Sequence, residues 1–340
     1  MIAPGLRVPR ERGEEVRRAL REAGALRTDL EISREAGALV FPLVEGAPVP
    51  DGVGTPAPFE FRAFGPVGPS DYRDRLAWTR DARAALPRSF DVVGDIVLVR
   101  LAEEVRPRRA EVGEALLGFV PGARIVGLDH GVHGAERRRS VERIAGSGGW
   151  RTRHRENGVE IEVDVERAYF SPRLAREHQR VASEVAEGDR VYDFCCGVGP
   201  FALTIARDGR ARQLTAVDAN PAAIELLRAS LVRARNARLV APVEASLEAY
   251  LPNAEPREKV ILNLPLEGIK YLPSVARTVA PRGRLYYYEV TPRTDLERRT
   301  EAVVESLGPK GAWTRADRHV VHPYSPSSDL VAFVLERGRS

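Results

Sequence analysis

The sequence contains little cysteine and no long apolar run, and each shortage excludes a class of protein. Its 340 residues include only two cysteines, Cys195 and Cys196, which are adjacent and cannot join distant segments through disulfides or form a multi-cysteine metal site. No run of about 18 or more apolar residues occurs, and the N-terminal residues contain no apolar core typical of a signal peptide. We therefore expect a soluble, cytoplasmic protein without a membrane span or a metal.

Lysine is also scarce, and the arginines that replace it are unevenly distributed. Only three of the 52 basic residues are lysine, and the net charge of +4 is too small to identify a partner. Residues 131–155 nevertheless hold a basic patch of seven arginines against Glu136 and Glu142. Guanidinium groups pair with phosphate oxygens, so the patch is either an RNA contact or a solvated face of an arginine-rich protein. The candidate RNA-binding residues are Arg137, Arg138, Arg139, Arg151, Arg153 and Arg155.

The first half of the chain predicts two small domains. A helix over 11–23 and a strand over 38–44 indicate an α/β unit at 1–48, and the segment 49–69, rich in proline and glycine, is the candidate linker. A middle unit is expected over 70–165. Its predicted elements are a helix at 71–86, a strand or bent strand pair at 89–101 with Gly94 at the bend, a helix at 105–119, and strands at 123–128 and 158–165.

The second half, 166–340, alternates helices and strands regularly. Such alternation predicts a parallel sheet with helices on both faces, and two final strands close in sequence can pair antiparallel. The expected strands are 190–194, 213–218, 239–243, 259–263, 283–290, 313–321 and 329–336. The expected helices are 173–186, 200–208, 221–235, 268–279 and 295–306.

The segment VYDFCCGVGPFAL has the form of a nucleotide-binding loop. Asp193 ends a strand, Gly197 and Gly199 precede a helix, and Asp218 ends the next strand, where an acid can accept both ribose hydroxyls. Together with Ala202, the glycines also match the weak dinucleotide fingerprint. Asp193 would repel a pyrophosphate but attract the cationic groups of S-adenosylmethionine, so the charge favours the methyl donor over NAD. A simple tight turn is the third interpretation.

The next two strands end in further candidate ligand contacts. Glu244 and Ala245 follow the strand at 239–243, where they can meet an adenine edge. Asn263 and Pro265 follow the strand at 259–263, at the edge where ligands bind in doubly wound sheets. An ordinary loop entry is the alternative for Asn263 and Pro265.

Several segments taken together resemble the archaeal and eukaryotic tRNA (guanine-37, N1)-methyltransferases. They are LRVPRERGEEVRRALREAGAL, LPRSFDVVGDIVLVRL, RENGVEIEVDVERAYFSPRLAREHQRV, DFCCGVGPF, DANP, LNLPL and HPYSP, in the family's order and over nearly the whole chain. The resemblance implies an α/β fold: a Rossmann-like class I methyltransferase domain, with a mostly parallel seven-stranded sheet, after two smaller N-terminal domains. It implies a monomer that binds tRNA at the outer corner and the anticodon branch and methylates guanine 37, leaving S-adenosylhomocysteine.

The resemblance also assigns roles to residues. Glu177 takes the general-base position, although a solvent-exposed helix acid is the ordinary interpretation of that residue. Arg137, or Arg139 if the register shifts, stabilises charge on O6, while Tyr169, Asn263 and Pro265 complete the guanine pocket. The implied site for S-adenosylmethionine consists of Phe170, Arg173, Asp193, Cys195, Gly197, Gly199, Phe201, Asp218, Ala219, Asn220, Glu244, Ala245 and Asn263.

Two departures from the family pattern and three rival functions remain open. Family members usually carry arginine where this chain has His178, which can alter the orientation of Glu177 or couple to its titration. The Cys195–Cys196 pair replaces a small or aromatic pair. The rivals are aminocarboxypropyl transfer in the wybutosine pathway, methylation of a tricyclic guanine derivative at the same position, and tRNA binding without catalysis.

Overall fold

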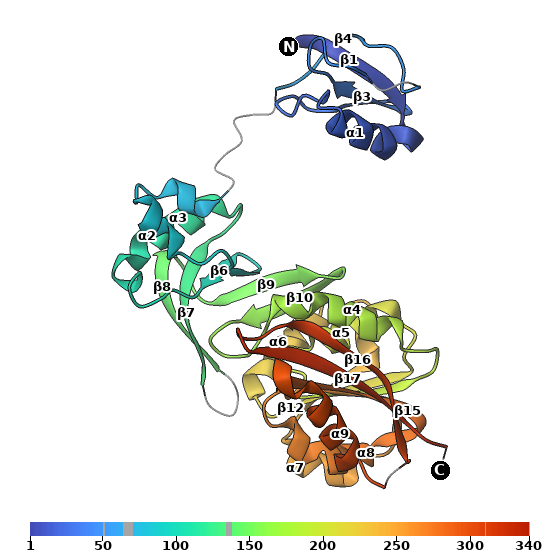
Figure 1. The fold of residues 1–340 in the computed structure, drawn as a ribbon. Helices are drawn as coiled ribbons and strands as arrows, with labels where there is room; N and C mark the ends of the chain where they lie inside the picture. The colour runs from blue at the N-terminus through green and yellow to red at the C-terminus, as the bar shows by residue number, and fades with distance from the viewer. Residues whose placement is uncertain (50–51, 64–70, 134–137, 310, 340) are drawn as a thin grey trace. The chain divides into compact units, whose positions relative to one another are not determined.

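The computed structural model describes residues 1–49, 52–63, 71–133, 138–309 and 311–339. The chain divides into two compact units, Met1–Asp71 and Tyr72–Ser340. Figure 1 shows both units. Arg137 falls outside the described residues, as does the side chain of Arg138, so the structure does not test these two candidates.

The N-terminal unit is a four-stranded sheet in the order β2-β3-β1-β4, packed against one helix. Its elements are β1 (Ile2–Pro9), α1 (Gly13–Glu22), β2 (Ser33–Glu35), β3 (Ala38–Pro42) and β4 (Ala57–Glu60). Val16 and Leu20, one turn apart on α1, are buried against Leu6 and Phe41 of the sheet. Helical spacing of apolar residues is what places them on one face.

The predicted linker at 49–69 is wrong over part of its length. β4 pairs antiparallel with β1, and Ala63 forms a bridge with Leu30, so residues 57–63 complete the first unit. The alternation of Phe59, Phe61 and Ala63 with polar residues is consistent with a strand, but the prolines and glycines on either side, and Pro58 within it, made the segment look like a loop; proline is tolerated in such an edge strand.

The middle region begins the second unit with a four-stranded sheet in the order β5-β6-β7-β8. Its strands are β5 (Asp91–Val93), β6 (Ile96–Val99), β7 (Ile125–His133) and β8 (Arg138–Gly146), and α3 (Arg109–Phe119) packs on them. The bent pair predicted at 89–101 is confirmed as β5 and β6, with Gly94 at a φ of +57° between them.

The helix predicted at 71–86 is wrong as a single element. It is divided into a 3-10 turn at Tyr72–Arg75 and the short α2 (Arg80–Ala84), with a buried Trp78 between them. Thr79 caps α2 by accepting a hydrogen bond from the amide of Ala82, so the helix begins there.

A hairpin of β9 (Arg151–Glu156) and β10 (Val159–Asp164) follows and packs with the C-terminal region. Val159, Ile161 and Val163 of β10 belong to the same core as the large sheet, and the amide of Glu162 donates to Ser230. The predicted domain boundary at 165 therefore lies too late in the chain, because the preceding hairpin already packs with the C-terminal region.

The C-terminal region is a seven-stranded sheet in the order β13-β12-β11-β14-β15-β17-β16, which confirms the predicted architecture. β17 pairs antiparallel with both β15 and β16, whereas β11 to β15 run parallel. The strands are β11 (Arg190–Phe194), β12 (Gln213–Asp218), β13 (Val240–Glu244), β14 (Arg257–Leu262), β15 (Val279–Pro292), β16 (Trp313–Pro323) and β17 (Ser328–Arg337).

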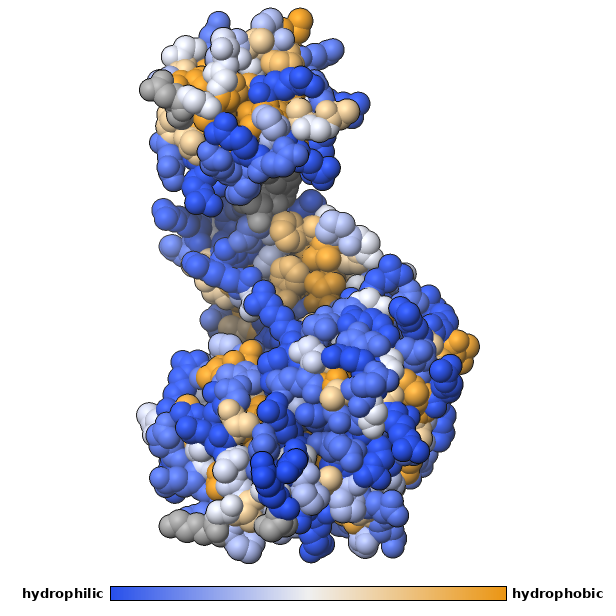
Figure 2. All heavy atoms as spheres, turned by 90° about the vertical axis from the view of Figure 1, so that its right-hand side faces the viewer, coloured by the Kyte–Doolittle hydropathy of each residue, from blue (hydrophilic) through white to orange (hydrophobic). Residues whose placement is uncertain are grey.

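Helices cover both faces of this sheet, as regular alternation requires (Figure 1). They are α4 (Ala175–Ser183), α5 (Pro200–Asp208), α6 (Pro221–Leu231), α7 (Leu247–Tyr250), α8 (Leu272–Ala276) and α9 (Leu296–Ser306). Hydrophilic residues dominate the face of the C-terminal region in Figure 2, in keeping with an apolar core enclosed between these layers. Within the described ranges, none of the helices is both long and apolar enough to cross a membrane.

Candidate active site

A cavity of about 490 Å³ opens at the carboxyl ends of β11, β12 and β14. That volume lies within the range of small-molecule and cofactor sites. Nine of the predicted site residues line it: Tyr169, Phe170, Cys195, Gly197, Asp218, Ala219, Asn220, Asn263 and Pro265. Residues from four separate segments thus converge at the edge where parallel sheets bind ligands.

The loop after β11 is shaped by left-handed backbone conformations. Gly197 and Gly199 have φ values of +56° and +76°, and Cys195 adopts +57° although it carries a side chain. A Cβ on Gly199 would approach Leu227 Cδ1 to 2.5 Å, so the loop passes close to α6. The glycines therefore have a conformational reason for their positions, and the loop leads directly into α5.

Asp218 fastens this loop to the end of β12. Its Oδ2 accepts a hydrogen bond from the amide of Gly197 at 2.7 Å, and its Oδ1 accepts one from the amide of Asn220 at 2.8 Å. The carboxylate also lines the cavity. One acid thereby fixes the loop backbone and presents negative charge to a ligand.

Asp193 lies beneath the loop rather than on the cavity wall. It is fully buried, its Oδ2 accepts a hydrogen bond from the amide of Ala202 at 3.2 Å, and its Oδ1 has no partner among the described residues. Burial raises the pKa of Asp193 to about 8, with the charge of Asp218 adding to the effect. Burying an ionised carboxylate that has one oxygen without a hydrogen-bond partner costs free energy, unless a nearby cation offsets its charge.

Asn263 and Pro265 occupy the loop after β14. Asn263 is half-buried and Pro265 is buried, and the carbonyl of Pro265 accepts a hydrogen bond from the amide of Val290 at 2.9 Å. This contact holds the loop against β15. Both residues line the cavity, so the simple loop interpretation does not account for their position.

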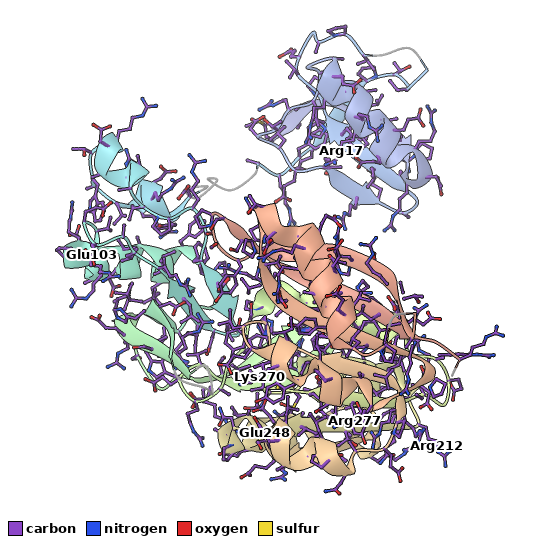
Figure 3. The ribbon with its side chains drawn as sticks, turned by 60° about the horizontal axis from the view of Figure 1, so that its bottom comes forward. Arg17, Glu103, Arg212, Glu248, Lys270 and Arg277 are labelled. Carbon is purple, nitrogen blue, oxygen red and sulfur yellow. The ribbon has the colours of Figure 1, made fainter. Side chains whose placement is uncertain are left out.

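Other predicted residues lie outside the cavity wall. Glu244 is exposed at the end of β13, and the adenine contact predicted for it is not supported by its position. Glu248, four residues further along, lines the cavity instead and accepts a hydrogen bond from the Tyr271 hydroxyl. Figure 3 shows Glu248 and Lys270 in the same part of the C-terminal region. Ser246 caps α7 and turns the chain so that Glu248 reaches the cavity.

Three further predicted cofactor residues have structural partners. The guanidinium of Arg173 pairs with Asp91 of β5 at 2.8 Å. The amide of Ala245 donates to the carbonyl of Asp218 at 3.0 Å, and Phe201 packs inside the core. None of the three lines the cavity.

Glu177 is buried, so the interpretation as a solvent-exposed helix acid is wrong. Its carboxylate accepts hydrogen bonds from Arg180 at 2.6 and 2.9 Å, from Tyr288 at 2.7 Å and from His319 at 3.1 Å. Burial acts to raise the pKa of Glu177, but the hydrogen bonds from Arg180 and His319 outweigh it and lower the pKa to about 2. A general base that works near neutral pH is better served by a higher pKa than this. Glu177 also does not line the cavity.

Its neighbour His178 does line the cavity. The ring is 1% exposed, its Nδ1 lies 2.6 Å from Oε1 of Glu156, and its Nε2 has no partner among the described residues. Phe201 packs against the ring in an edge-to-face arrangement at 4.5 Å. No sequence pattern connected Glu156 with His178.

The described part of the basic patch is largely neutralised within the protein. Arg139 is buried, pairs with Asp129 at 2.5 Å and donates to the carbonyl of Phe170 at 3.3 Å. It supports the wall behind Phe170 and is not available as a donor to O6. Arg151, Arg153 and Arg155 lie on the exposed face of β9 and pair with Glu160 or Glu162 of β10.

A further set of cavity residues was not predicted: Ser171, Leu174, Cys196, Pro200, Ala223, Ser246, Leu247, Leu264, Leu266, Glu267, Lys270, Tyr271, His322, Tyr324 and Leu330.

No group of three or more His, Cys, Asp or Glu side chains arranged to hold a metal occurs in the described ranges.

His322 and Tyr324 line the cavity and belong to the quoted segment HPYSP, which was the only sequence signal that pointed to their part of the cavity wall. Tyr169 and Asn263 face the same cavity as the nucleotide loop. The arrangement can hold a nucleoside against Asp218 and present a second planar group to Tyr169 and Asn263.

Comparison with known families agrees with this geometry along the chain. Residues 5–51 match the tRNA methyltransferase 5 N-terminal domain, residues 72–149 the TYW2 N-terminal domain, and residues 152–310 the TRM5/TYW2 methyltransferase domain. The tRNA (guanine(37)-N(1))-methyltransferase Trm5b of Pyrococcus abyssi is 32% identical over 85% of this chain and 85% of its own length.

Solved structures extend the similarity to the whole chain. The crystal structure of P. abyssi Trm5b is 29% identical, covers 99% of both chains and has a TM-score of 0.74. The complex of aTrm5 with tRNALeu is 25% identical, covers 98% of this chain and 100% of the other, and has a TM-score of 0.70. Methanocaldococcus jannaschii Trm5 with adenosine is 25% identical, covers 99% and 100%, and has a TM-score of 0.67. The chain therefore belongs to the tRNA (guanine(37)-N(1))-methyltransferase family that includes the Trm5b proteins.

Proposed function

We propose that this chain transfers a methyl group from S-adenosylmethionine to N1 of guanine 37 of tRNA, beside the anticodon, leaving S-adenosylhomocysteine. The observation that carries the proposal is the single cavity that joins Asp218 and the glycine loop to Tyr169, Asn263 and Pro265. P. abyssi Trm5b, similar to this chain over most of its length, is named for the same reaction.

The residues at the loop end fit a cationic nucleoside. Asp218 lies at the position from which a carboxylate accepts ribose hydroxyls, and Gly197 brings bare backbone to the cavity wall. Asp193 beneath the loop has a pKa raised by burial to about 8, so it is mostly protonated at neutral pH; a cationic ligand favours release of that proton, whereas an anionic dinucleotide opposes it. When bound, S-adenosylmethionine supplies an electrophilic methyl group on a positively charged sulfur.

The residues at the other end fit an extruded purine. N1 of a guanine stacked in a loop is poorly exposed, so the base has to leave its stack to reach a donor in a cavity. Asn263 offers both a donor and an acceptor to the base edge, and Tyr169 offers a ring face or a hydroxyl. Leu266 and Tyr324, 58% and 40% exposed on the rim, offer apolar surface to neighbouring bases.

The reaction requires the protein to accept a proton from the guanine and to stabilise negative charge on it. N1 carries a proton that has to leave, and negative charge then builds on O6. The resemblance assigns the charge on O6 to Arg137. It assigns the proton to Glu177 on α4, the helix that also contributes His178 to the cavity wall.

The two smaller domains account for tRNA selection in the proposal. Residues 5–51 match the Trm5 N-terminal domain, and we assign them to the outer corner of tRNA, with the remaining chain on the anticodon branch. Because one chain supplies both contacts in this arrangement, the proposal takes the protein to act as a monomer, in the cytoplasm.

Aminocarboxypropyl transfer from the same cofactor is the second candidate. It is favoured by the match of residues 72–149 to the TYW2 N-terminal domain. The Trm5 match at residues 5–51 and the Trm5b similarity over 85% of the chain favour methyl transfer.

The test is nucleoside analysis of an unmodified tRNA transcript incubated with the purified chain and S-adenosylmethionine. We expect 1-methylguanosine, and none from a matched transcript that carries adenine at position 37. An aminocarboxypropyl nucleoside, a methyl group at another position, or an unchanged transcript would contradict the proposal.

A further inference from the structure

Leu266 is a large apolar side chain exposed at the mouth of the cavity. It is 58% exposed and lines the cavity, whereas most large apolar side chains of the C-terminal region are enclosed in its core. A single exposed leucine is common on protein surfaces, so exposure alone indicates no function. Leu266 is distinguished by its position and by the way its loop is held.

Leu266 stands between two hollows of the surface. Pro265 and Leu266 line the main cavity and also a second hollow of about 290 Å³. Arg298 and Arg299 of α9 line that second hollow. The pair Pro265–Leu266 therefore forms a ridge between the cavity and the hollow beside α9. A polymer that placed one unit in the cavity and the next unit beside α9 would cross Leu266.

Backbone hydrogen bonds on both sides of Leu266 hold the loop. The carbonyl of Pro265 accepts a hydrogen bond from the amide of Val290 at 2.9 Å, and the amide of Gly268 donates to the carbonyl of Leu264 at 2.8 Å. The ring of Pro265 also fixes the φ angle of the residue before Leu266. Because these contacts fix the loop within the protein itself, little conformational entropy is lost when Leu266 contacts a ligand.

A buried polar network on β15 supports the same loop. A Cβ on Gly268 would lie 2.7 Å from the ring of Tyr287, so the loop packs directly on this strand. The Tyr287 hydroxyl donates to Oε2 of the buried Glu289 at 2.7 Å, and Arg299 donates to the same carboxylate at 2.6 and 2.8 Å. These charges are paired inside the protein. The ridge therefore presents the apolar side chain of Leu266 to a ligand, rather than the charges that support it.

Extrusion of a base creates a gap that such a side chain can fill. A guanine that leaves its stack uncovers one face of each neighbouring base, and this unstacking costs free energy. Proteins that unstack nucleic acids insert apolar side chains, leucine among them, between the separated bases. Leucine carries no hydrogen-bonding group on its side chain, so it fills the gap without reading which bases flank it.

We infer that Leu266 inserts between the two nucleotides that flank the target guanine and occupies the place that the guanine leaves. The inference rests on the proposed function and assigns the residue that stabilises its extruded base. Because Leu266 follows Pro265 on the cavity wall, the gap in the stack lies next to the cavity that receives the guanine. Leu266 is a positioning residue: it keeps the guanine out of the stack and takes no part in proton or methyl transfer.

The experiment measures single-turnover formation of 1-methylguanosine at saturating protein and S-adenosylmethionine. It uses an intact transcript and a transcript that lacks the base on the 3′ side of guanine 37. On the intact transcript, Leu266→Ala should slow the reaction by about 5- to 150-fold, which corresponds to the ~1–3 kcal/mol of a stacking contact with one base. On the abasic transcript the guanine has already lost one stacking neighbour, so the loss should fall below about threefold.

Two further variants serve as controls. Leu266→Met keeps an apolar side chain of similar volume and should stay within about threefold of the wild type on the intact transcript. Val232→Ala shortens another exposed apolar residue, 82% exposed and absent from the cavity wall, and should match the wild type on both transcripts. Thermal unfolding and the affinity for S-adenosylmethionine should be unchanged in each variant, because the side chains replaced are exposed.

A wild-type rate for Leu266→Ala on the intact transcript would overturn the inference. An equal loss on both transcripts would overturn it too, since Leu266 would then shape the cavity itself rather than fill the stack. A wild type that forms no 1-methylguanosine on the intact transcript overturns the proposed function as well, so the two failures are distinguishable.

Discussion

The loop edge of the large sheet and the outer face of the β9–β10 hairpin are both rich in charge, but they use it differently. In the hairpin, Arg153 and Arg155 each find a glutamate of β10 within 3.6 Å. At the loop edge, Asp193 is buried with one oxygen bare. The comparison teaches that ion pairs within the fold neutralise the hairpin arginines, whereas the sheet edge keeps a buried acid with one oxygen unpartnered among the described residues. A cluster of charged residues in the sequence does not reveal this difference.

The largest effect that sharpens this comparison is expected at Asp218. Asp218→Asn removes the charge from the loop edge and weakens the bonds to the amides of Gly197 and Asn220. Hydrogen bonds to charged groups contribute about 1.5–3 kcal/mol, so the Kd for S-adenosylmethionine should rise by roughly 10- to 150-fold. Titration calorimetry measures it. An unchanged Kd would show that the edge acid does not serve the ligand.

A smaller effect is expected from the titration of Asp193. Its folded-state pKa is raised to about 8, so below pH 8 the folded protein mostly holds the proton, and binding of a cationic ligand releases it. The affinity for S-adenosylmethionine should therefore rise with pH, by at most about tenfold per pH unit between pH 6.5 and 8, and then level off. Asp193→Asn should abolish this dependence. Affinity that falls over the same range would contradict the assignment.

A still smaller effect is expected in the hairpin. Because Arg151, Arg153 and Arg155 already have carboxylate partners, replacing all three by glutamine should weaken tRNA binding by no more than about threefold at physiological salt. Binding measured at two salt concentrations checks this. A salt dependence reduced by about one counterion per arginine would show that they contact phosphates and would restore the basic patch as an RNA contact.

The smallest effect is expected at Glu244, the matched control for Asp218. It ends the neighbouring strand, is exposed and does not line the cavity. Glu244→Gln should leave the Kd for S-adenosylmethionine within about twofold, since exposed groups without partners contribute little. A loss comparable to that of Asp218→Asn would place the adenine edge beside Glu244 after all.

The large sheet was predictable because its strands are buried on both faces. Apolar runs such as those of β11 and β14, each followed by a helical pattern, indicate parallel strands, and the order of elements then determines which loops meet. The glycine loop and Asp218 could be placed at one edge for the same reason. The prediction that they contact a ligand rested on that placement alone.

The hairpin was missed at β9 because nearly all of its residues are polar. Its exposed face carries arginines, and its inner face carries Thr152, His154 and Glu156, which are buried or half-buried. Strand prediction depends on apolar residues at alternate positions, and here the inward-facing positions are polar groups that bond to residues outside the strand: Thr152 to Asp95, His154 to the amide of Gly94, and Glu156 to His178. The same feature concealed the pairing of Glu156 with His178, which joins residues 22 positions apart.

The contact between Gly94 and His154 has a consequence for how this protein can be divided. Gly94 belongs to the turn between β5 and β6, and a Cβ there would come within 2.2 Å of the Thr152 hydroxyl. Arg173 likewise depends on Asp91 of β5 for its partner. A fragment that begins at residue 152 would keep the glycine loop but lose the backbone donor behind His154 and the anchor of Arg173. The C-terminal region therefore depends on contacts from the middle region to hold β9 and Arg173 in place, and a replacement for the middle region would have to supply the same two contacts.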